Sequence, residues 1–451
     1  MILLLVLLPL IAALAMIPLG RWRLVATPLS AAILLAVASL ALVVGDGEMI
    51  VLGRPLRLSQ AESALLAANI GLMALVLMLA YRVAPAAHAY TLTLGAVMFL
   101  LAAVMVRNQS IASLLQQAGI VLAAMLIPTE HPRSPTTATH TLMALSLGAP
   151  LLLLSAYSLE LAGTRPDSAW LRHMGSVALV WACALRLAVA PFHLWVSPVF
   201  RHGHPTSALL LTVLLPSVVV LPLAAIVLGT ELPAEASFMT TVLTAGGALT
   251  VLVGSLSALP QRSLSSVLGH LAVADMGMVL LGLGTATPEG VQAALAHLLG
   301  RGVAITLVCI ALANIRLCVS SDDLGQFRGL LKRAPFSVLA VAIGGLSLAG
   351  MPPTIGFASR FGLLRLLAFD RLDWALALAA CGFASAWAVV RPLIAALTPP
   401  SVPDLRREPR WWRLVMVPLM LLLLVPGLIS AYPDSLPLGW LRQLLGLAAL
   451  P

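Results

Sequence analysis

The sequence predicts an all-α fold, a polytopic membrane bundle of about fourteen transmembrane helices. Of its 451 residues 61% are hydrophobic and 10% are charged, and the mean hydropathy is +1.04, so too few polar side chains are present to cover a surface facing water. In a bilayer only continuous helices or closed barrels satisfy their backbone hydrogen bonds. The apolar runs here are unbroken, about 20 residues long, and lack the alternation of barrel strands, so they favour helices.

The individual spans follow from these apolar runs, since each is long enough to cross about 30 Å of hydrocarbon. The first run, residues 2–19, has no basic residue before it, whereas Arg21 and Arg23 follow it. This is the reverse of the charge order of a secretory signal, and we interpret the run as a retained first helix. The sequence predicts spans near residues 2–19, 24–45, 60–81, 89–106, 111–128, 138–162, 174–198, 206–229, 237–258, 264–284, 289–315, 335–368, 374–398 and 413–432.

The formal net charge of +9 is spread over short loops between the apolar runs. Loops that follow odd-numbered spans carry about twice as many Lys and Arg as loops that follow even-numbered spans. By the positive-inside rule the odd loops are cytoplasmic, which places both termini on the outer face of the cell inner (plasma) membrane. This dispersed charge indicates topology signals in a lipid bilayer and argues against nucleic acid as a partner.

An internal repeat becomes visible when two of the spans are aligned. The run from Ser176 to Pro191 aligns without gaps on the run from Ser337 to Pro352. Proline removes a backbone donor and clashes with the preceding turn, so we expect broken helices at Pro191 and at Pro352-Pro353. The two spans are an odd number apart, which predicts two inverted five-helix repeats of the kind that ion transporters use. Two ordinary proline kinks are the alternative interpretation.

No Gly/Ser linker or polar block divides the chain, and we therefore expect a single membrane domain over residues 1–451. Within it the sequence predicts N-terminal helices in 1–85, the first inverted repeat in 86–230, the second in 236–398, and a C-terminal helix in 410–451.

Several ionisable residues fall inside the predicted spans, where a charge is costly to insert, about 2.5–3.5 kcal/mol for Arg or Asp at the centre of the bilayer. Arg186 precedes the Pro191 break, and Arg360 follows the second break by about two turns. A functional role next to the breaks is one interpretation; snorkelling to an interface or structural pairing with Asp275 is the other. The full set of candidates is Glu62, Arg186, Asp275, His270, His297, Arg301, Arg360 and Arg391.

Histidines also gather after the first break, at His193, His202 and His204. No Cys or carboxylate near them in sequence completes a metal-ligand set, so we expect histidines beside a proton path, with His270 and His297 in the same role. The four cysteines lack ligand spacing, and there is no phosphate-binding loop or dinucleotide fingerprint. The sequence therefore predicts no cofactor, no metal and no catalytic residue of its own.

Three stretches resemble the antiporter-like, proton-translocating membrane subunits of respiratory complex I (the M and N type), a family related to Mrp antiporter and membrane-bound hydrogenase subunits. They are the run from Ala188 to Trp195 followed by His204-Pro205-Thr206, the run from Gly345 to Phe357, and the run from Gln261 to His270 with Asp275-Met276-Gly277. With the matching helix count and repeat, the resemblance covers nearly the whole chain.

The resemblance implies a hydrated proton path lined by a glutamate on the fifth helix and by lysines on the seventh, eighth, and tenth or twelfth. This sequence departs from that pattern, because the only lysine, Lys332, lies in a loop. Arginine keeps a fixed charge and cannot relay a proton. The residues at or near the family positions are Gln116 and Gln117 for the glutamate, and Arg186, Ser217, Ser265 and Arg360 for the lysines.

On this basis we expect a membrane subunit of a complex-I-type or hydrogenase-type complex that takes part in proton or cation translocation. Its partners would be other membrane subunits and soluble redox subunits that carry the electron transfer, and its path residues would be Arg186, Arg360, His193, His270, His297 and Asp275. One alternative is a non-conducting scaffold subunit of such a complex, which the missing glutamate and lysines favour. Another is a component of an Mrp-like or bicarbonate/proton transporter.

Overall fold

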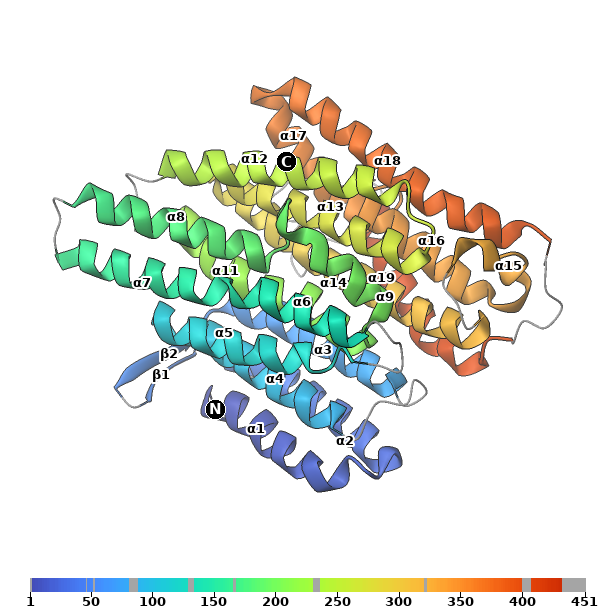
Figure 1. Ribbon diagram of the computed structural model, residues 1–451, viewed down its shortest axis with the longest axis horizontal. Helices are drawn as coiled ribbons and strands as arrows, with labels where there is room; N and C mark the ends of the chain where they lie inside the picture. Colours follow the sequence, from blue (N-terminus) through green and yellow to red (C-terminus); the bar gives the residue numbers. More distant parts are fainter. Residues whose placement is uncertain are drawn as a thin grey trace. The chain divides into compact units, whose positions relative to one another are not determined.

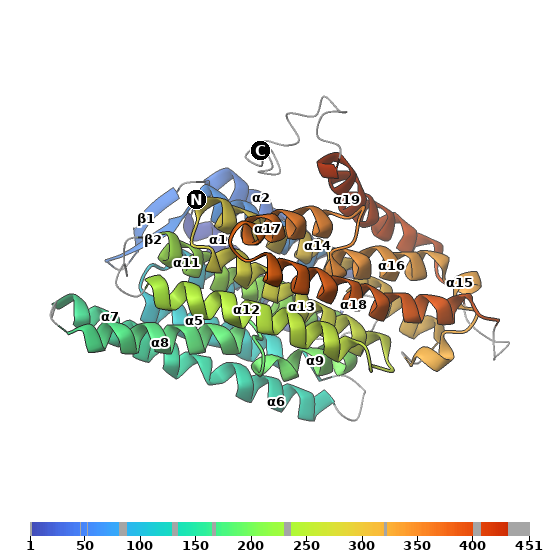
Figure 2. The same ribbon diagram turned by 90° about the horizontal axis from the view of Figure 1, so that it is seen from above.

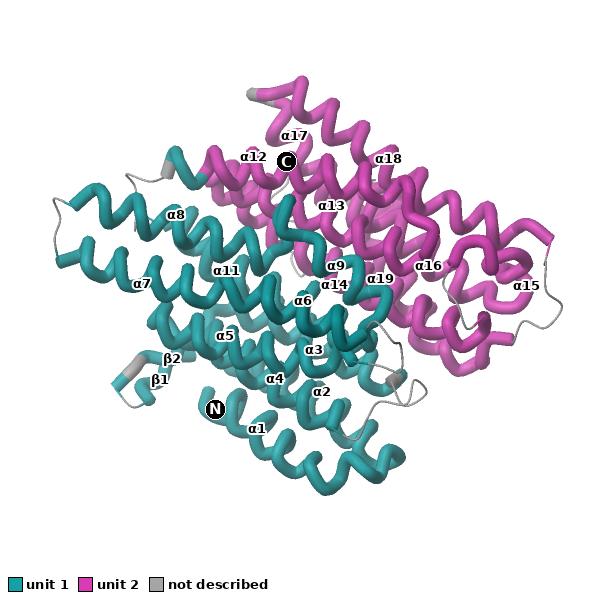
Figure 3. Tube along the Cα trace, in the orientation of Figure 1, with its two compact units in different colours: residues 1–239 teal, residues 240–451 magenta. Residues whose placement is uncertain are grey.

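A computed structural model describes residues 2–431, except for 46, 52, 81–87, 129–133, 165–167, 230–235, 320–322 and 400–406. The described chain is almost entirely helical (Figures 1 and 2). It divides into two compact units, Met1–Met239 and Thr240–Pro451, coloured separately in Figure 3. That the whole chain forms one membrane domain with inverted repeats stays a prediction, and part of the predicted C-terminal segment, 432–451, lies outside the described residues.

Ten described segments are long and apolar enough to cross a membrane, and three shorter apolar helices accompany them. Most of the predicted spans coincide with these helices to within a few residues, which confirms the helical membrane fold, whereas the total of about fourteen crossings stays a prediction. The predicted spans 174–198 and 335–368 each contain a helix that ends before the end of the span. One difference concerns the predicted span 138–162. The structure begins a helix earlier, at Ser134, and interrupts it at Leu147, so that α6 and α7 occupy this region.

Unit 1 contains eleven complete α-helices, a β-hairpin and two short irregular helices among its described residues. In both views α7 and α8 lie side by side. Its elements are α1 (Ile2–Leu19), α2 (Arg23–Val44), β1 (Gly47–Val51), β2 (Arg54–Leu58), α3 (Gln60–Ala80), α4 (Ala89–Met105), α5 (Gln109–Ala124), α6 (Ser134–Ser146), α7 (Gly148–Thr164), α8 (Ala169–Arg186), the 3-10 helix η1 (Phe192–Trp195), α9 (Val196–His202), α10 (Pro205–Leu209), the π-helix η2 (Leu210–Leu214) and α11 (Leu215–Leu228).

The hairpin between α2 and α3 was not predicted from the sequence. Its strands are antiparallel, and the register pairs Gly47 with Leu58 and Val51 with Arg54. Gly53 in the turn has a φ of +74°, a conformation that glycine adopts readily and that two-residue hairpin loops require.

Unit 2 is built around two helices that are buried along nearly their whole length. In the most apolar window of α13, 94% of the residues are buried, and the figure for α14 is 89%, against 39% for α18. A helix buried on every side is the centre of its unit, whereas α18 leaves apolar side chains for lipid. The elements are α12 (Ala236–Ala258), whose start carries the unit boundary, α13 (Leu264–Gly284), α14 (Pro288–Val319), η4 (Leu324–Gln326), α15 (Leu330–Arg333), α16 (Pro335–Ala349), α17 (Ile355–Asp370), α18 (Leu372–Leu397), η5 (Arg410–Trp412) and α19 (Arg413–Ala431).

Helix starts follow from local sequence. The Asn108 side chain accepts a hydrogen bond from the Ile111 amide at the start of α5, and the Ser263 hydroxyl accepts one from the Ser266 amide at the start of α13. Both are residues that satisfy the unpaired amides of a first helical turn. Pro335 opens α16 at a position where the missing amide hydrogen costs nothing.

Both predicted helix breaks are present. In unit 1, α8 ends at Arg186 and the chain resumes as η1 after Pro191. In unit 2, α16 ends at Ala349 and α17 starts at Ile355, after Pro352 and Pro353. The peptide bonds Ala190-Pro191 and Pro352-Pro353 are cis.

The two breaks correspond with a shift of one residue from the gapless alignment. Ala188 has a φ of +55°, and the next amide, of Val189, donates to the Ala184 carbonyl. In unit 2, Gly350 has a φ of +70°, and the next amide, of Met351, donates to the Leu346 carbonyl. These features end each half-helix in the same way and place Pro191 opposite Pro353 instead of Pro352. Because both aligned runs consist mainly of small apolar residues, the sequence alignment alone does not fix which proline is equivalent to Pro191.

Candidate functional site

In unit 1 the polar site centres on Arg186, in the last turn of α8. Its side chain is fully buried, with 0% of its surface exposed, and Nη1 donates a hydrogen bond to Oε1 of Gln116 on α5. Gly148 at the start of α7 permits this placement, since a Cβ there would lie 3.0 Å from Nε of Arg186. The structure therefore joins two residues that the resemblance had placed at the family's glutamate and lysine positions.

Two further polar pairs near these helices are neutral. Gln117 Nε2 donates to the Ser146 hydroxyl at 2.7 Å, and Asn69 Nδ2 donates to the Ser217 hydroxyl at 2.8 Å. Amides and hydroxyls exchange hydrogen bonds but do not gain or lose a proton near neutral pH. Together with Arg186, whose charge is fixed, these pairs form a polar site in unit 1. None of the paired side chains takes up or releases a proton.

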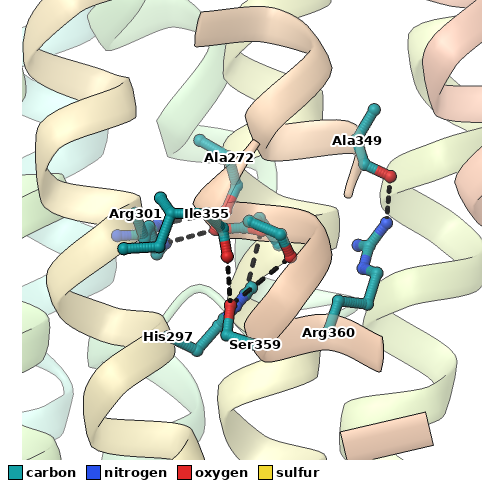
Figure 4. A network of polar contacts seen from close by, with 9 residues as sticks. Ala272, His297, Arg301, Ala349, Ile355, Ser359 and Arg360 are labelled. Atoms are coloured by element: carbon teal, nitrogen blue, oxygen red, sulfur yellow. Dashed lines mark hydrogen bonds and ion pairs between the residues drawn. The ribbon is translucent and has the colours of Figure 1, made fainter. Parts of the chain in front are cut away.

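In unit 2 a buried ionic cluster lies between α13 and α14. Asp275 Oδ1 lies 3.0 Å from Nε2 of His297, and Asp275 Oδ2 lies 3.5 Å from Nε of Arg301. His297 and Arg301 are one helical turn apart on α14 and therefore share a face. Arg301 Nη2 also donates to the Ala272 carbonyl at 3.0 Å (Figure 4). The exposed fractions of Asp275 and His297 are each 1%, so the carboxylate and the imidazole interact out of water.

The imidazole of His297 is bonded on both sides. Its Nδ1 lies 2.7 Å from the hydroxyl of Ser359 on α17, and that hydroxyl also reaches the Ile355 carbonyl at 3.1 Å (Figure 4). When the Ser359 hydroxyl donates to the Ile355 carbonyl, its oxygen accepts a hydrogen bond from a proton on Nδ1 of His297. A second proton is then needed between Nε2 of His297 and the carboxylate of Asp275. When the hydroxyl rotates to donate to Nδ1, one proton on Nε2 suffices. The geometry thus accommodates two protonation states.

Arg360, the neighbour of Ser359, connects the two halves of the broken helix. Its Nη1 donates to the carbonyl of Ala349, the last residue of α16, and its side chain is buried (Figure 4). A cation at this end of α16 also offsets the partial negative charge of the helix terminus. Gly350 leaves the space that the guanidinium occupies, because a Cβ there would lie 2.9 Å from both Nε and Nη1 of Arg360.

The structure does not bring all the candidates together. Asp275, His297, Arg301 and Arg360 belong to one region of unit 2, whereas Arg186 and His193 belong to unit 1, where His193 is buried in η1.

Three more candidates have local partners outside the cluster. His270 is half-buried and its Nδ1 lies 2.8 Å from the Ser266 carbonyl of its own helix. Glu62 forms an ion pair with Arg107 at 3.2 Å. Arg391 donates to the carbonyls of Leu259 and Gln261. Sequence reasoning did not identify Ser359, whose only signal was its place next to Arg360.

Metal-binding chemistry finds no support in the described ranges, where no group of three or more His, Cys, Asp or Glu side chains could hold an ion. The four cysteines, all among the described residues, are buried and free of disulfides. What the site offers is therefore one buried carboxylate-imidazole pair, two guanidinium groups beside it, and a hydroxyl from the second half of a broken helix.

Comparison with known proteins identifies the family to which this chain belongs. The family described as NADH:quinone oxidoreductase/Mrp antiporter, transmembrane, matches residues 153–385, which is just over half of the chain and includes both breaks. The chain belongs to this family. It is therefore a multi-pass membrane protein of the antiporter-like kind, and the resemblance seen in its motifs is confirmed.

Relatives within the family are similar over part of their length. Subunit N 2 of the NADH-quinone oxidoreductase of Solidesulfovibrio magneticus is 38% identical over 185 residues, which cover 40% of this chain and 38% of the relative. Subunit N from Desulfovibrio desulfuricans is 29% identical over 273 residues, 54% of each chain. The matched part of the chain thus spans between about two fifths and about half of these relatives.

Solved structures share the fold over the whole chain. A chain of the archaeal membrane-bound sulfane sulfur reductase superposes with a TM-score of 0.83 at 20% identity, covering 99% of this chain and 96% of that one. A chain of the Mrp complex from Dietzia sp. gives a TM-score of 0.82 at 18% identity, covering 99% and 96%. A chain of respiratory complex I from Thermus thermophilus gives 0.81 at 19%, covering 99% and 98%.

Proposed function

We propose that this chain is an antiporter-like membrane subunit of an energy-converting complex of the complex I or hydrogenase type, and that it takes part in proton or cation translocation coupled to electron transfer on partner subunits. Its family membership and its similarity to subunit N of NADH-quinone oxidoreductases support this function. Other membrane subunits would hold it in the complex, and soluble redox subunits would carry the electron chemistry.

The observation that carries the proposal is that both ring nitrogens of His297 have a hydrogen-bond partner. A buried imidazole between a carboxylate and a hydroxyl exchanges a proton when the hydroxyl rotates, and this hydroxyl belongs to α17, the second half of a broken helix. The pair would release one of its two protons to a water molecule of the path, and the Ser359 hydroxyl would then rotate to donate to Nδ1 of His297. Arg301 and Arg360 keep their charge throughout and stabilise the ionised carboxylate.

The test uses the purified complex reconstituted in liposomes, with electron transfer and proton uptake measured in the same sample. We expect His297→Gln or Asp275→Asn to slow proton exchange through this subunit by about 100-fold or more, since each removes a group that takes up and releases a proton. The number of protons moved per electron would then fall by this subunit's share.

The control is His140→Gln. It removes an exposed histidine on α6, and we expect it to leave the ratio of protons to electrons unchanged. A normal ratio in both His297→Gln and Asp275→Asn, in complexes that assemble fully, would reject proton exchange at this pair.

A scaffold role is the second candidate, and a specific observation favours it. In unit 1 the family's glutamate and lysine positions hold Gln116 and Arg186, which are bonded to one another and cannot exchange a proton. A component of an Mrp-like or bicarbonate/proton transporter is a third, favoured by the shared fold with the Mrp complex chain. Soluble redox subunits that co-purify with the chain would support the first two functions over this one.

The proposed location is the cell inner (plasma) membrane, with both termini on its outer face. The support is the excess of Lys and Arg in loops that follow odd-numbered spans, which favours the cytoplasmic side for those loops.

A further inference from the structure

The buried charge of Arg186 lacks a protein counter-charge among the described residues of unit 1. The described acidic residues of this unit are Glu48 and Glu160, which are exposed, and Glu62, which is paired with Arg107. The partner of Arg186 is a neutral amide, Oε1 of Gln116. A buried cation without a counter-charge costs several kcal/mol in an apolar interior, so the site requires an explanation.

The hydrogen bonds of the guanidinium point the same way. Nη1 is bonded to Gln116, whereas Nε and Nη2 are buried and have no hydrogen-bond acceptor within the described part of the chain. Two buried donors on a charged group are expensive to leave unsatisfied. The end of α8 contributes about half an elementary negative charge, which reduces the cost without removing it.

The cost cannot be avoided by deprotonation, as it can for a lysine, because a guanidinium stays charged under all physiological conditions. Unit 2 offers an instructive contrast. There Asp275 lies 3.5 Å from Nε of Arg301 and supplies a carboxylate within the protein. Unit 1 has the cation but, in its described part, no such carboxylate.

Gly148 packs tightly against the guanidinium and offers it no side-chain acceptor. Gly148 has no side chain, and a Cβ built there would lie 3.0 Å from Nε and 3.3 Å from Cγ of Arg186. We propose that a small monovalent anion, of the size and charge of chloride, binds Arg186 and supplies the missing counter-charge. The anion takes the place of the carboxylate that Gln116 lacks, and this site does not depend on the proton exchange proposed for unit 2.

Bromide is the probe, because it replaces chloride and is located by its anomalous scattering. Crystals of the detergent-purified complex soaked in bromide should show a peak within hydrogen-bonding distance of Nε or Nη2 of Arg186. Gln116→Glu places a carboxylate beside the guanidinium and should remove this peak. Gln109→Glu adds the same charge on the same helix, at a residue bonded to Ser155, and should retain it. No peak in the natural protein, or a peak that persists in Gln116→Glu, would overturn the proposal.

A measurement in solution gives a second, independent answer. An anion that binds only the folded protein raises its unfolding temperature, so replacing chloride by gluconate should lower the unfolding temperature of the natural protein. Chloride should act on Arg186→Met at concentrations at least about tenfold higher, since the variant lacks the charged donor. Equal chloride dependence in the natural protein and in Arg186→Met would also count against the site, whether or not Gln116→Glu assembles.

Discussion

Each of the two arginines beside the helix breaks is packed against a glycine. Gly148 faces Nε of Arg186, and Gly350 faces Nε and Nη1 of Arg360. A guanidinium is rigid and planar, so its direction is set by what surrounds it. At both breaks, a glycine without a side chain thus sets where the guanidinium group of an arginine lies.

Gly350→Ala tests this placement. The residue has a φ of +70°, which an alanine adopts at a cost of about 1 kcal/mol, and its Cβ would also push the Arg360 side chain away from the Ala349 carbonyl. We expect the free energy of unfolding to fall by about 1–3 kcal/mol more than the cost of φ alone, because the added carbon overpacks the site. Thermal unfolding in detergent measures the loss.

Gly53→Ala is the matched control for that experiment. Gly53 has a φ of +74°, and a Cβ there would meet nothing within 4 Å, so its substitution measures the cost of the backbone conformation by itself. Equal losses in Gly350→Ala and Gly53→Ala would mean that the contact with Arg360 contributes nothing to stability.

At the scale of elements, the sequence predicts where helices form and break, but it does not predict which distant residues come into contact. Unbroken apolar runs and proline positions are local signals, and the spans and both breaks follow from them. The hairpin at Gly47–Leu58 was missed because this short segment between two long apolar runs gives little alternation to detect. The contact of His297 with Ser359 joins residues 62 positions apart, which no local pattern encodes.

The start of α16 depends on a residue distant in sequence. The carboxylate of Glu408 accepts hydrogen bonds from the amide of Ser337 at 3.1 Å and from its hydroxyl at 3.0 Å, and Oε1 accepts one from the Phe336 amide at 3.3 Å. Glu408 thus caps the first turn of the half-helix that ends at the break, and its negative charge is favourable at that end.

Glu408→Gln tests this cap. The amide keeps one acceptor oxygen but loses the charge, and we expect the free energy of unfolding to fall by about 1–2 kcal/mol. Glu289→Gln is the control, since Glu289 is exposed in the first turn of α14 and makes the same change of charge at a helix start. A loss in Glu408→Gln no larger than in Glu289→Gln would show that the cap is dispensable.

At the scale of the whole molecule, both units contain a broken helix, but the polar groups beside the break differ. Each contains a broken helix with an arginine at the break, Arg186 or Arg360. Among the described residues, only the cluster of unit 2 adds a carboxylate and an imidazole to its arginine. The sequence suggested all these residues but not how they divide, because membership of a cluster depends on helix packing. On the proposed function, proton exchange would belong to unit 2 and a fixed field to unit 1, so the two roles would be separable by mutation.

This separation gives the last prediction, which distinguishes a conducting subunit from a scaffold. If the arginines shape the field along a proton path, Arg186→Met and Arg360→Met should each lower the number of protons moved per electron in the reconstituted complex. Arg186→Lys should largely preserve it, since lysine keeps the charge.

Arg391→Met serves as the control for the removal of a guanidinium, because Arg391 binds the carbonyls of Leu259 and Gln261 away from the cluster and should leave the ratio unchanged. In a scaffold, no field acts on moving protons, and all four variants would keep the natural ratio even where assembly suffers. An unchanged ratio in assembled Arg186→Met and Arg360→Met complexes would therefore reject the conducting role, whereas a loss confined to Arg360→Met would restrict conduction to unit 2.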